Sequence, residues 1–201
     1  TGKEEISIEK RALLTFCADN GVVEENVTQS GQEVTATVAE NFLQEKATAA
    51  ILCRGAHADL FPIDIGMARD TKVPRYKVAY GTKNMAKGPA MTREEALTGR
   101  GAGLSSEGLA RKIAAIEKAI AINQPDPSDP IDVLAKVGGF DIAGMAGVFL
   151  AGAAHGVPVV MDGFISCVAA LLAARIAPFA KDYMIRSEEH TSELQSQRTI
   201  S

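Results

Sequence analysis

Short apolar runs that end in polar loops alternate with helical patterns along this chain, and this alternation restricts its fold more than any other feature. The run Ala12–Cys17 (ALLTFC) ends in ADNG, and the run Val157–Met161 (VPVVM) ends in Asp162 and Gly163. Continuous apolar runs of this length are typical of strands that are buried in a parallel sheet. Strands that alternate with helices predict an α/β fold.

The other elements fit this pattern. Two more strands are predicted at Leu60–Ile65 and at Arg75–Tyr80, the second partly exposed because basic and apolar residues alternate in it. In one helix, Leu109, Ile113, Ile116 and Ile120 fall on a single stripe. The predicted helices are two short ones within Gln32–Cys53 that break near Thr48, followed by Ser106–Ile122, Ile131–Val137, Asp141–Ala154 and Phe164–Ala174.

Composition excludes several classes of protein. With 46% hydrophobic and 23% charged residues the chain is typical of a globular protein, and 201 residues suffice for one domain or one with a small attachment. Lys and Arg number 21 against 25 Asp and Glu, so the net charge of −4 argues against a nucleic-acid partner. No uninterrupted apolar run reaches the roughly 18 residues of a membrane span.

The cysteines indicate a reducing compartment. Cys17, Cys53 and Cys167 are odd in number and form no C-x-x-C pair, so neither a disulfide framework nor a zinc site is indicated. Their apolar neighbours predict buried, unreactive thiols. We therefore expect a cytoplasmic protein without a bound metal.

One interruption lies inside the chain. The sequence Thr92-Arg93-Glu94-Glu95 is a capping box, which marks the start of a helix. Only Ala96 and Leu97 follow before TGRGAG breaks the helix. We expect an internal segment to have been lost between Leu97 and Thr98.

A second interruption is the tail Arg186–Ser201. It has almost no apolar residues, and its composition alone is that of a disordered tail. Its sequence RSEEHTSELQS is also the in-frame translation of a widely used short-read sequencing adapter. We expect residues 1–185 to be an incomplete natural domain, shortened at its front as well, and residues 186–201 to be a non-native tail.

Three segments resemble a known family. They are CADNGVVEENV, GTKNMAKGPAMTREEA and the stretch from Asp129 to Pro178 that contains KVGGFDIAGMAGVFLAGAAHGVPVVMDGFISC. Together they are similar to nicotinate-nucleotide–dimethylbenzimidazole phosphoribosyltransferases, from about Ala12 to Ile185. The resemblance implies a homodimer of doubly wound, Rossmann-like parallel sheets with helices on both faces. It also implies a small helical domain, largely missing here, and a ligand crevice at the carboxyl ends of the strands.

The reaction that this resemblance implies transfers phosphoribose from nicotinate mononucleotide to an aryl base such as 5,6-dimethylbenzimidazole. The products are α-ribazole 5′-phosphate and nicotinate, in the synthesis of the lower ligand of cobalamin, and no metal or redox cofactor is needed. Such a reaction requires a phosphate site, a flat apolar slot and a carboxylate that accepts the proton of the attacking nitrogen.

The resemblance assigns candidate residues to two of these needs. Gly101 and Gly103 precede the Ser106 helix and offer backbone amides to a phosphate, to which Lys112 adds charge. A plain glycine-rich turn with a solvated lysine would have the same sequence. Ser30 and Asp162 match family residues at the aryl-base site, although Val38 stands where a relative has glutamine.

Bland alternatives remain for several polar residues. Asp162 also suits a cap for the helix that follows it, and Ser30 needs no special role in a polar loop. His57 and His155 lie at predicted helix ends, where an imidazole offsets the macrodipole. Asp19, Asp64 and Asn84 follow predicted strands, where they line the crevice or cap turns, and the methionines are expected to pack in the core.

Two motifs of the family are missing from the chain. The nucleotide-holding motif TGE-[ML]-G-[IM]-[GA]-N-T-T should fall between Glu95 and Thr98, and the catalytic glutamate belongs to a G-E-G-S-G motif. The glutamates of the tail do not replace that glutamate. We therefore assign no catalytic residue and expect an inactive chain; the alternatives are a remnant that binds nucleotide or dimerises without turnover, and an unstable fragment.

Overall fold

The computed structural model describes residues 9–96 and 106–187 of the chain. The chain divides into two compact units. Among the described residues, the larger unit is 9–144 and the smaller unit is 145–187. We describe each unit by itself.

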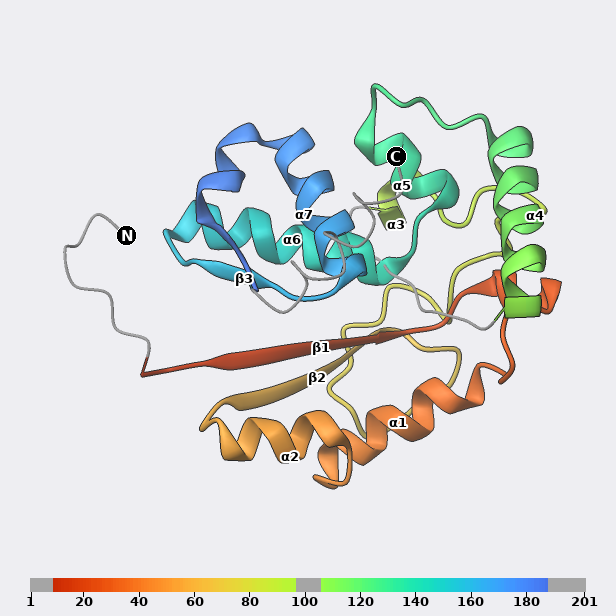
Figure 1. The fold of residues 1–201 in the computed structure, drawn as a ribbon. Helices are drawn as coiled ribbons and strands as arrows, with labels where there is room; N and C mark the ends of the chain where they lie inside the picture. The colour runs from red at the N-terminus through yellow and green to blue at the C-terminus, as the bar shows by residue number, and fades with distance from the viewer. Residues whose placement is uncertain (1–8, 97–105, 188–201) are drawn as a thin grey trace. The chain divides into compact units, whose positions relative to one another are not determined.

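The larger unit is built on a parallel pair of strands with two helices. Strand β1 (Ala12–Ala18) pairs with β2 (Asp59–Gly66), with Ala12 opposite Asp59. The connection between them passes through η1 (Gly21–Glu25), α1 (Glu33–Leu43) and α2 (Thr48–Gly55), and a parallel pair needs such a crossover. Figure 1 shows α1 and α2 running along the two strands. The strands predicted at Ala12–Cys17 and Leu60–Ile65 and the break between the two helices are confirmed.

Small residues and two larger apolar ones form the core beneath this pair. Ala36 and Ala39 of α1 are buried together with Cys17, Met67 and Val73. Because α1 presents alanines to the strands, its backbone lies close to the sheet. Met67 follows β2 and is fully buried, and Met91 is 2% exposed, so these two methionines have the packing role predicted for them.

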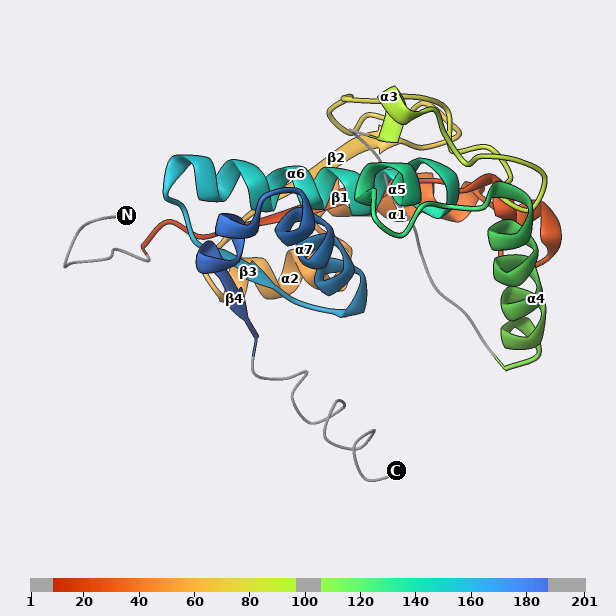
Figure 2. The ribbon, with the colours of Figure 1, turned by 90° about the horizontal axis from the view of Figure 1, so that it is seen from above.

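Helices complete the larger unit after β2. These are α3 (Arg93–Ala96), α4 (Ser106–Asn123), α5 (Pro130–Val137) and the first residues of α6 (Phe140–His155). Helix α5 contacts both α3 and α4. Figure 2 shows the three helices from above. It begins at Pro130 because the Asp129 carboxylate accepts from the amides of Ile131 and Asp132.

The capping box is confirmed as the start of α3. The Thr92 hydroxyl accepts from the Glu95 amide at 3.1 Å, and the Glu95 carboxylate accepts from the Thr92 amide at 2.7 Å. The described part of the helix that it starts is Arg93–Ala96. A reciprocal cap thus stabilises the first turn of this helix.

The smaller unit has its own parallel pair. After α6 come β3 (Val159–Met161), α7 (Phe164–Ile176), η2 (Pro178–Tyr183) and β4 (Met184–Arg186). β3 pairs with β4, with Val159 opposite Met184. Helix α7 contacts β3 and η2. Strand β4 was not predicted, because three residues are too few to show a periodicity.

The structure is α/β with parallel strands, as predicted, but the described strands form two two-stranded sheets rather than one continuous sheet. The strand predicted at Arg75–Tyr80 is wrong. Only an isolated bridge joins Arg75 to Asp64, although the Val78 amide also donates to Ile65. The side chain of Lys77 in this segment is buried against the Asp64 carboxylate. In a partly exposed strand a lysine would instead face solvent.

The isoleucine stripe of α4 differs from the usual behaviour of an apolar helical stripe, which faces a core. Ile113, Ile116 and Ile120 are 48%, 38% and 49% exposed, and the buried face of the helix instead carries Ala115 and Ala119. Within the described ranges, no helix has the length and apolar character to cross a membrane.

Candidate active site

Two buried carboxylates lie where β1 and β2 end. Asp19 directly follows β1, and Asp64 lies near the end of β2; they are 4% and 1% exposed. One Asp19 oxygen accepts from the Ala68 amide at 2.7 Å, and one Asp64 oxygen accepts from the amides of Gly66 and Met67 at 3.1 and 2.9 Å. Both side chains therefore hold the chain that leaves β2, as the turn-capping alternative proposed.

The surroundings of Asp19 shift its pKa upward. Burial raises the pKa of this carboxyl above its ordinary value, and the nearby Asp64 charge adds to the rise. Hydrogen bonds from the Thr35 side chain and the Ala68 amide, together with Lys77, act in the opposite direction without cancelling it. Asp19 is thus a carboxyl whose ionisation is disfavoured at the end of a strand.

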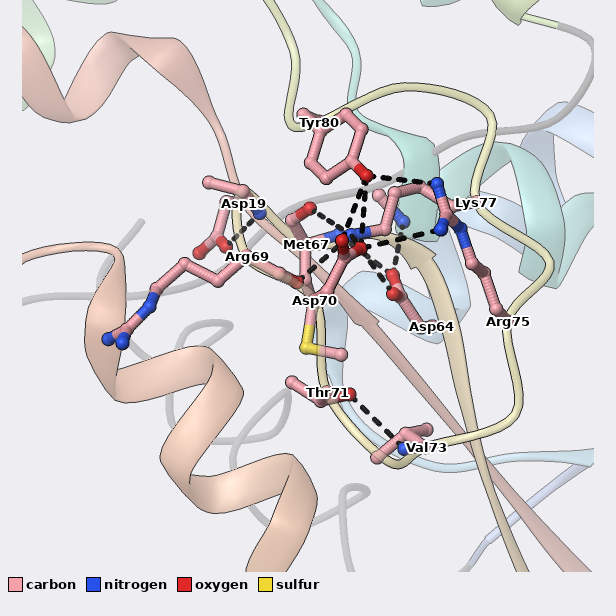
Figure 3. Close-up of polar contacts among 12 residues, drawn as sticks. Asp19, Asp64, Met67, Arg69, Asp70, Thr71, Val73, Arg75, Lys77 and Tyr80 are labelled. Carbon is pink, nitrogen blue, oxygen red and sulfur yellow. Dashed lines mark hydrogen bonds and ion pairs between the residues drawn. The ribbon is translucent and has the colours of Figure 1, made fainter.

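Lys77 is the residue that sequence reasoning missed. Its side chain is 1% exposed, and its Nζ lies 3.2 Å from the Asp64 carboxylate. The same nitrogen donates to the carbonyl of Met67 at 2.8 Å and to that of Arg69 at 2.9 Å, and it lies 4.1 Å from the centre of the Tyr80 ring. Figure 3 shows these contacts converging on Lys77.

Asp70 and Tyr80 close this network on its exposed side. The Tyr80 hydroxyl donates to Asp70 at 3.0 Å, and this hydrogen bond, with smaller effects of Lys77 and Arg75, lowers the pKa of Asp70. A lysine between two apolar residues gives no signal of such burial, because the signal lies in its distant partner Asp64.

The loop that carries Ser30 lies at the end of β1. The Gln32 side chain donates to the Asn20 carbonyl at 3.2 Å, which ties this loop to the residues that follow the strand. On the other side, the Thr82 hydroxyl accepts from the Gly21 amide at 3.2 Å. Ser30 itself is exposed. A candidate base-binding residue therefore stands on the surface at the carboxyl edge of the β1–β2 pair.

Asn84 joins this edge to an acidic pair. It is 8% exposed and donates to Glu24 at 3.2 Å and to Glu25 at 2.8 Å. A hydrogen bond from Lys87 holds the pKa of Glu24 below its usual range, and the same contact raises the pKa of Lys87. A cavity of about 680 Å³ opens here, lined by Glu24, Lys83, Asn84, Lys87, Gly88, Pro89, Met91, Thr92, Arg93, Asp132, Ala135 and Lys136.

The helix of the predicted phosphate site is tied to the same loop. Lys112 lies in the second turn of α4, and the side chain of its neighbour Arg111 donates to the Asn26 carbonyl at 2.8 Å. Asn26 belongs to the segment that leads to Ser30. Gly101 and Gly103, the other predicted phosphate ligands, lie outside the described residues. The structure thus brings the turn that carries Lys112 to the loop of the candidate base site.

Asp162 belongs to the smaller unit and directly follows β3. Its carboxylate accepts from the Ser187 hydroxyl at 2.9 Å, and its carbonyl accepts from the Ser166 hydroxyl at 2.7 Å. The capping alternative for Asp162 is wrong, because Gly163 is the N-cap of α7 and no side chain caps that helix. Asp162 is exposed at the end of a parallel strand, which is the usual place of functional residues in α/β folds.

Other predicted residues have ordinary surroundings. Cys17 and Cys53 are buried, as predicted. The prediction for Cys167 is wrong, because it lies on a face of α7 whose apolar residues Phe164 and Leu171 are themselves exposed. His155 ends α6 and His57 follows α2, which confirms their places at helix ends. Among the residues that the structure describes, no group of three His, Cys, Asp or Glu side chains is arranged to hold a metal ion.

The chain matches one family on both sides of Leu97. A family model described as "Phosphoribosyltransferase" matches residues 1–98 and, separately, residues 95–200. Curated relatives named nicotinate-nucleotide–dimethylbenzimidazole phosphoribosyltransferase include one from Clostridium tetani, 39% identical over 93% of this chain and 66% of its own length. Another, from Geobacter metallireducens, is 39% identical over 94% of this chain and 69% of its own length. The chain therefore spans about two thirds of the length of these relatives.

A solved structure agrees with the sequence comparison. The crystal structure of the Thermus thermophilus enzyme of the same name has a TM-score of 0.79 and 30% identity, and it covers 88% of this chain and 68% of its own. The Clostridium tetani alignment has 239 positions, more than the 201 residues of this chain. Since 93% of 201 is about 187 residues, about 52 aligned positions of the relative have no counterpart here.

Proposed function

The chain belongs to the nicotinate-nucleotide–dimethylbenzimidazole phosphoribosyltransferase family, and on that premise we propose that its natural parent transfers phosphoribose from nicotinate mononucleotide to 5,6-dimethylbenzimidazole. The products are α-ribazole 5′-phosphate and nicotinate, a step in the synthesis of the cobalamin lower ligand. The observation that carries this proposal is the family match in both parts of the chain, which includes each segment that holds a candidate site residue.

The larger unit supplies part of the proposed nucleotide site. Gly101, Gly103 and Lys112 bind the 5′-phosphate, because backbone amides ahead of a helix and a lysine on its second turn are suited to an anion. The Arg111–Asn26 hydrogen bond supports this assignment, since it holds that turn beside the Ser30 loop. A phosphate and a base must be bound near each other for one nucleotide to occupy both sites.

Ser30 and Asp162 are the proposed aryl-base residues. Each is exposed at the carboxyl end of a parallel strand pair, one in either unit. An exposed hydroxyl donates to a ring nitrogen, and an exposed carboxylate accepts from an N–H of the base. Their support is the family resemblance together with this exposure.

We propose that this chain does not catalyse the phosphoribosyl transfer. It does not contain the TGE-type nucleotide motif that the family carries between the positions of Glu95 and Thr98. The separate matches that meet at residues 95–98, and the 52 unmatched positions, support the loss of an internal segment between Leu97 and Thr98.

One set of measurements tests these statements on the purified chain. We expect no α-ribazole 5′-phosphate in the presence of both substrates, while the Clostridium tetani relative in the same assay forms it. Turnover at the relative's rate would contradict the proposed inactivity. Binding of nicotinate mononucleotide by calorimetry, weakened by Lys112→Ala but unchanged by Lys118→Ala, would support a remaining nucleotide site. A sample without a cooperative melt would instead be an unstable fragment.

We also propose that the protein is a homodimer and that it is cytoplasmic. The homodimer rests on the family resemblance, and sedimentation of the purified chain tests it. The cytoplasmic location rests on the odd number and wide spacing of the three cysteines, which do not indicate a disulfide framework.

A further inference from the structure

Helix α4 has its larger apolar residues on the outside of the larger unit. Ile113, Ile116 and Ile120 follow the spacing of one helical face and are 38–49% exposed. The face that α4 buries is a neighbouring one, about 95° around the axis at 100° per residue, and it carries Ala115, Ala119 and Asn123. The two faces are therefore distinct, and the isoleucine face is by far the more exposed of the two among the described residues.

The buried face is firmly attached. The Asn123 side chain donates to the Met85 carbonyl at 2.9 Å, and Arg111 donates to Asn26 near the other end of the helix. These contacts fix the rotation of α4 about its axis. Turning the isoleucines inward would break both hydrogen bonds, so the isoleucine face is a fixed surface of this unit rather than one orientation of a loosely held helix.

A cavity also lies beside α3, on the N-terminal side of Leu97. Met91, Thr92 and Arg93 line the cavity of about 680 Å³, and the described part of α3 is the capped turn Arg93–Ala96. The α3 end and the α4 start thus flank residues 97 and 98, where the family match divides. About 52 aligned positions of the Clostridium tetani relative have no counterpart in this chain.

From this juxtaposition we propose that the isoleucine face of α4 is the docking surface for the segment that the relatives carry between the positions of Leu97 and Thr98. The occupant is an apolar stretch within about 52 residues, a length sufficient for a helix and a strand. Its short connection to α4 holds it near that helix, so it reaches the isoleucines at little entropic cost. The inference rests on the proposed loss of an internal segment and does not depend on the proposed activity.

The test compares the same substitutions in two backgrounds. One is the chain as it stands, and the other carries the corresponding Clostridium tetani residues inserted between Leu97 and Thr98. The variant is Ile113→Gln/Ile116→Gln/Ile120→Gln, because glutamine keeps the helix propensity while it removes the apolar surface. The matched control is Leu43→Gln/Ile51→Gln/Leu52→Gln, on α1 and α2, where the side chains are 43%, 50% and 66% exposed.

We expect the isoleucine variant to shift the melting temperature of the present chain by no more than about 2 °C, as surface substitutions do. In the restored chain the same variant should lower it by about 10 °C or more, since it places three polar groups in an interface. Insertion alone should reduce the fluorescence of a bound apolar dye by the same fraction as the isoleucine variant does. The control variant should shift the melting temperature equally in both backgrounds.

Equal effects of the isoleucine variant in both backgrounds would overturn the proposal. So would light scattering that shows the present chain to be a dimer which this variant dissociates, because the face would then belong to a second copy. Should the restored chain not fold, the intact Clostridium tetani protein gives the answer. Glutamine at its position aligned with Ile116 must lower its melting temperature, and glutamine at the position aligned with Ile51 must not.

Discussion

Replacing the buried Lys77 by methionine should be among the most damaging single changes in the larger unit. Methionine keeps the length and apolar stem of lysine but removes the charge. The Asp64 carboxylate, whose side chain is 2% exposed, then loses its ion pair at 3.2 Å. The Met67 and Arg69 carbonyls also lose a donor, at 2.8 and 2.9 Å. Removing one partner of a buried ion pair costs about 3–5 kcal/mol, because the remaining charge is buried without compensation.

The assay is urea unfolding followed by circular dichroism, with Lys87→Met as the matched control. Lys87 also pairs with a carboxylate, that of Glu24, but both side chains are 62% exposed, so its loss should leave the unfolding midpoint unchanged. Asp64→Asn/Lys77→Met should be more stable than Lys77→Met by about 1–3 kcal/mol, since the amide oxygen still accepts from Gly66 and Met67 without a buried charge. Equal midpoints for Lys77→Met and Lys87→Met, or strict additivity of the two buried substitutions, would refute the reasoning.

Three other changes test particular contacts. Gly147→Ala should stabilise α6 by about 0.5–1 kcal/mol, because nothing lies within 4 Å of the new methyl group. Gly152→Ala should destabilise the same helix, because its methyl group would lie 2.8 Å from the Val157 carbonyl. Melting temperatures that move in the same direction for the two variants would contradict this prediction. Gly21→Ala places a methyl group 2.6 Å from the backbone of Thr82 and Lys83 and should lower the melting temperature by several degrees, while Gly55→Ala, with open space around it, should not. Asp19→Asn should change the pH dependence of stability. Because the pKa of Asp19 is raised, the folded state holds this proton more tightly than the unfolded state does. The proton therefore stabilises the folded state below the unfolded pKa of about 3.9, and this stabilisation is lost as the pH rises through the folded pKa. Melting temperatures of the variant should therefore lack that loss above pH 4, and parallel curves for the two proteins would show that Asp19 is not its source.

The order of elements could be predicted from sequence because local rules determine it. The apolar run at Ala12–Cys17, the capping box at Thr92 and the helix expected at Ile131–Val137 each occur as predicted, although α5 begins one residue earlier. These signals lie within a few residues of one another, so no knowledge of distant partners is needed. The resemblance also placed the chain in its family from motifs that are continuous in the sequence.

What depends on distant partners could not be predicted. The alternating residues around Lys77 have the pattern of an exposed strand, and only the position of Asp64 on a neighbouring strand makes that lysine a buried cation. In the same way, Asp162 looks like a helix cap until Gly163 is found in that position with φ of 90°.

The sequence by itself determined the α/β class, the family and the identity of the candidate residues, since periodicity, caps and motifs are local properties of the chain. The tertiary structure alone decided which groups meet, namely Lys77 with Asp64 and the turn of Lys112 with the Ser30 loop. It also decided that α4 buries its alanine face far more completely than its isoleucine face. The physical reason is that burial and ion pairing are set by contacts between residues far apart in the chain. A helical stripe specifies that a partner surface is needed, and only the packed structure shows whether the chain provides one.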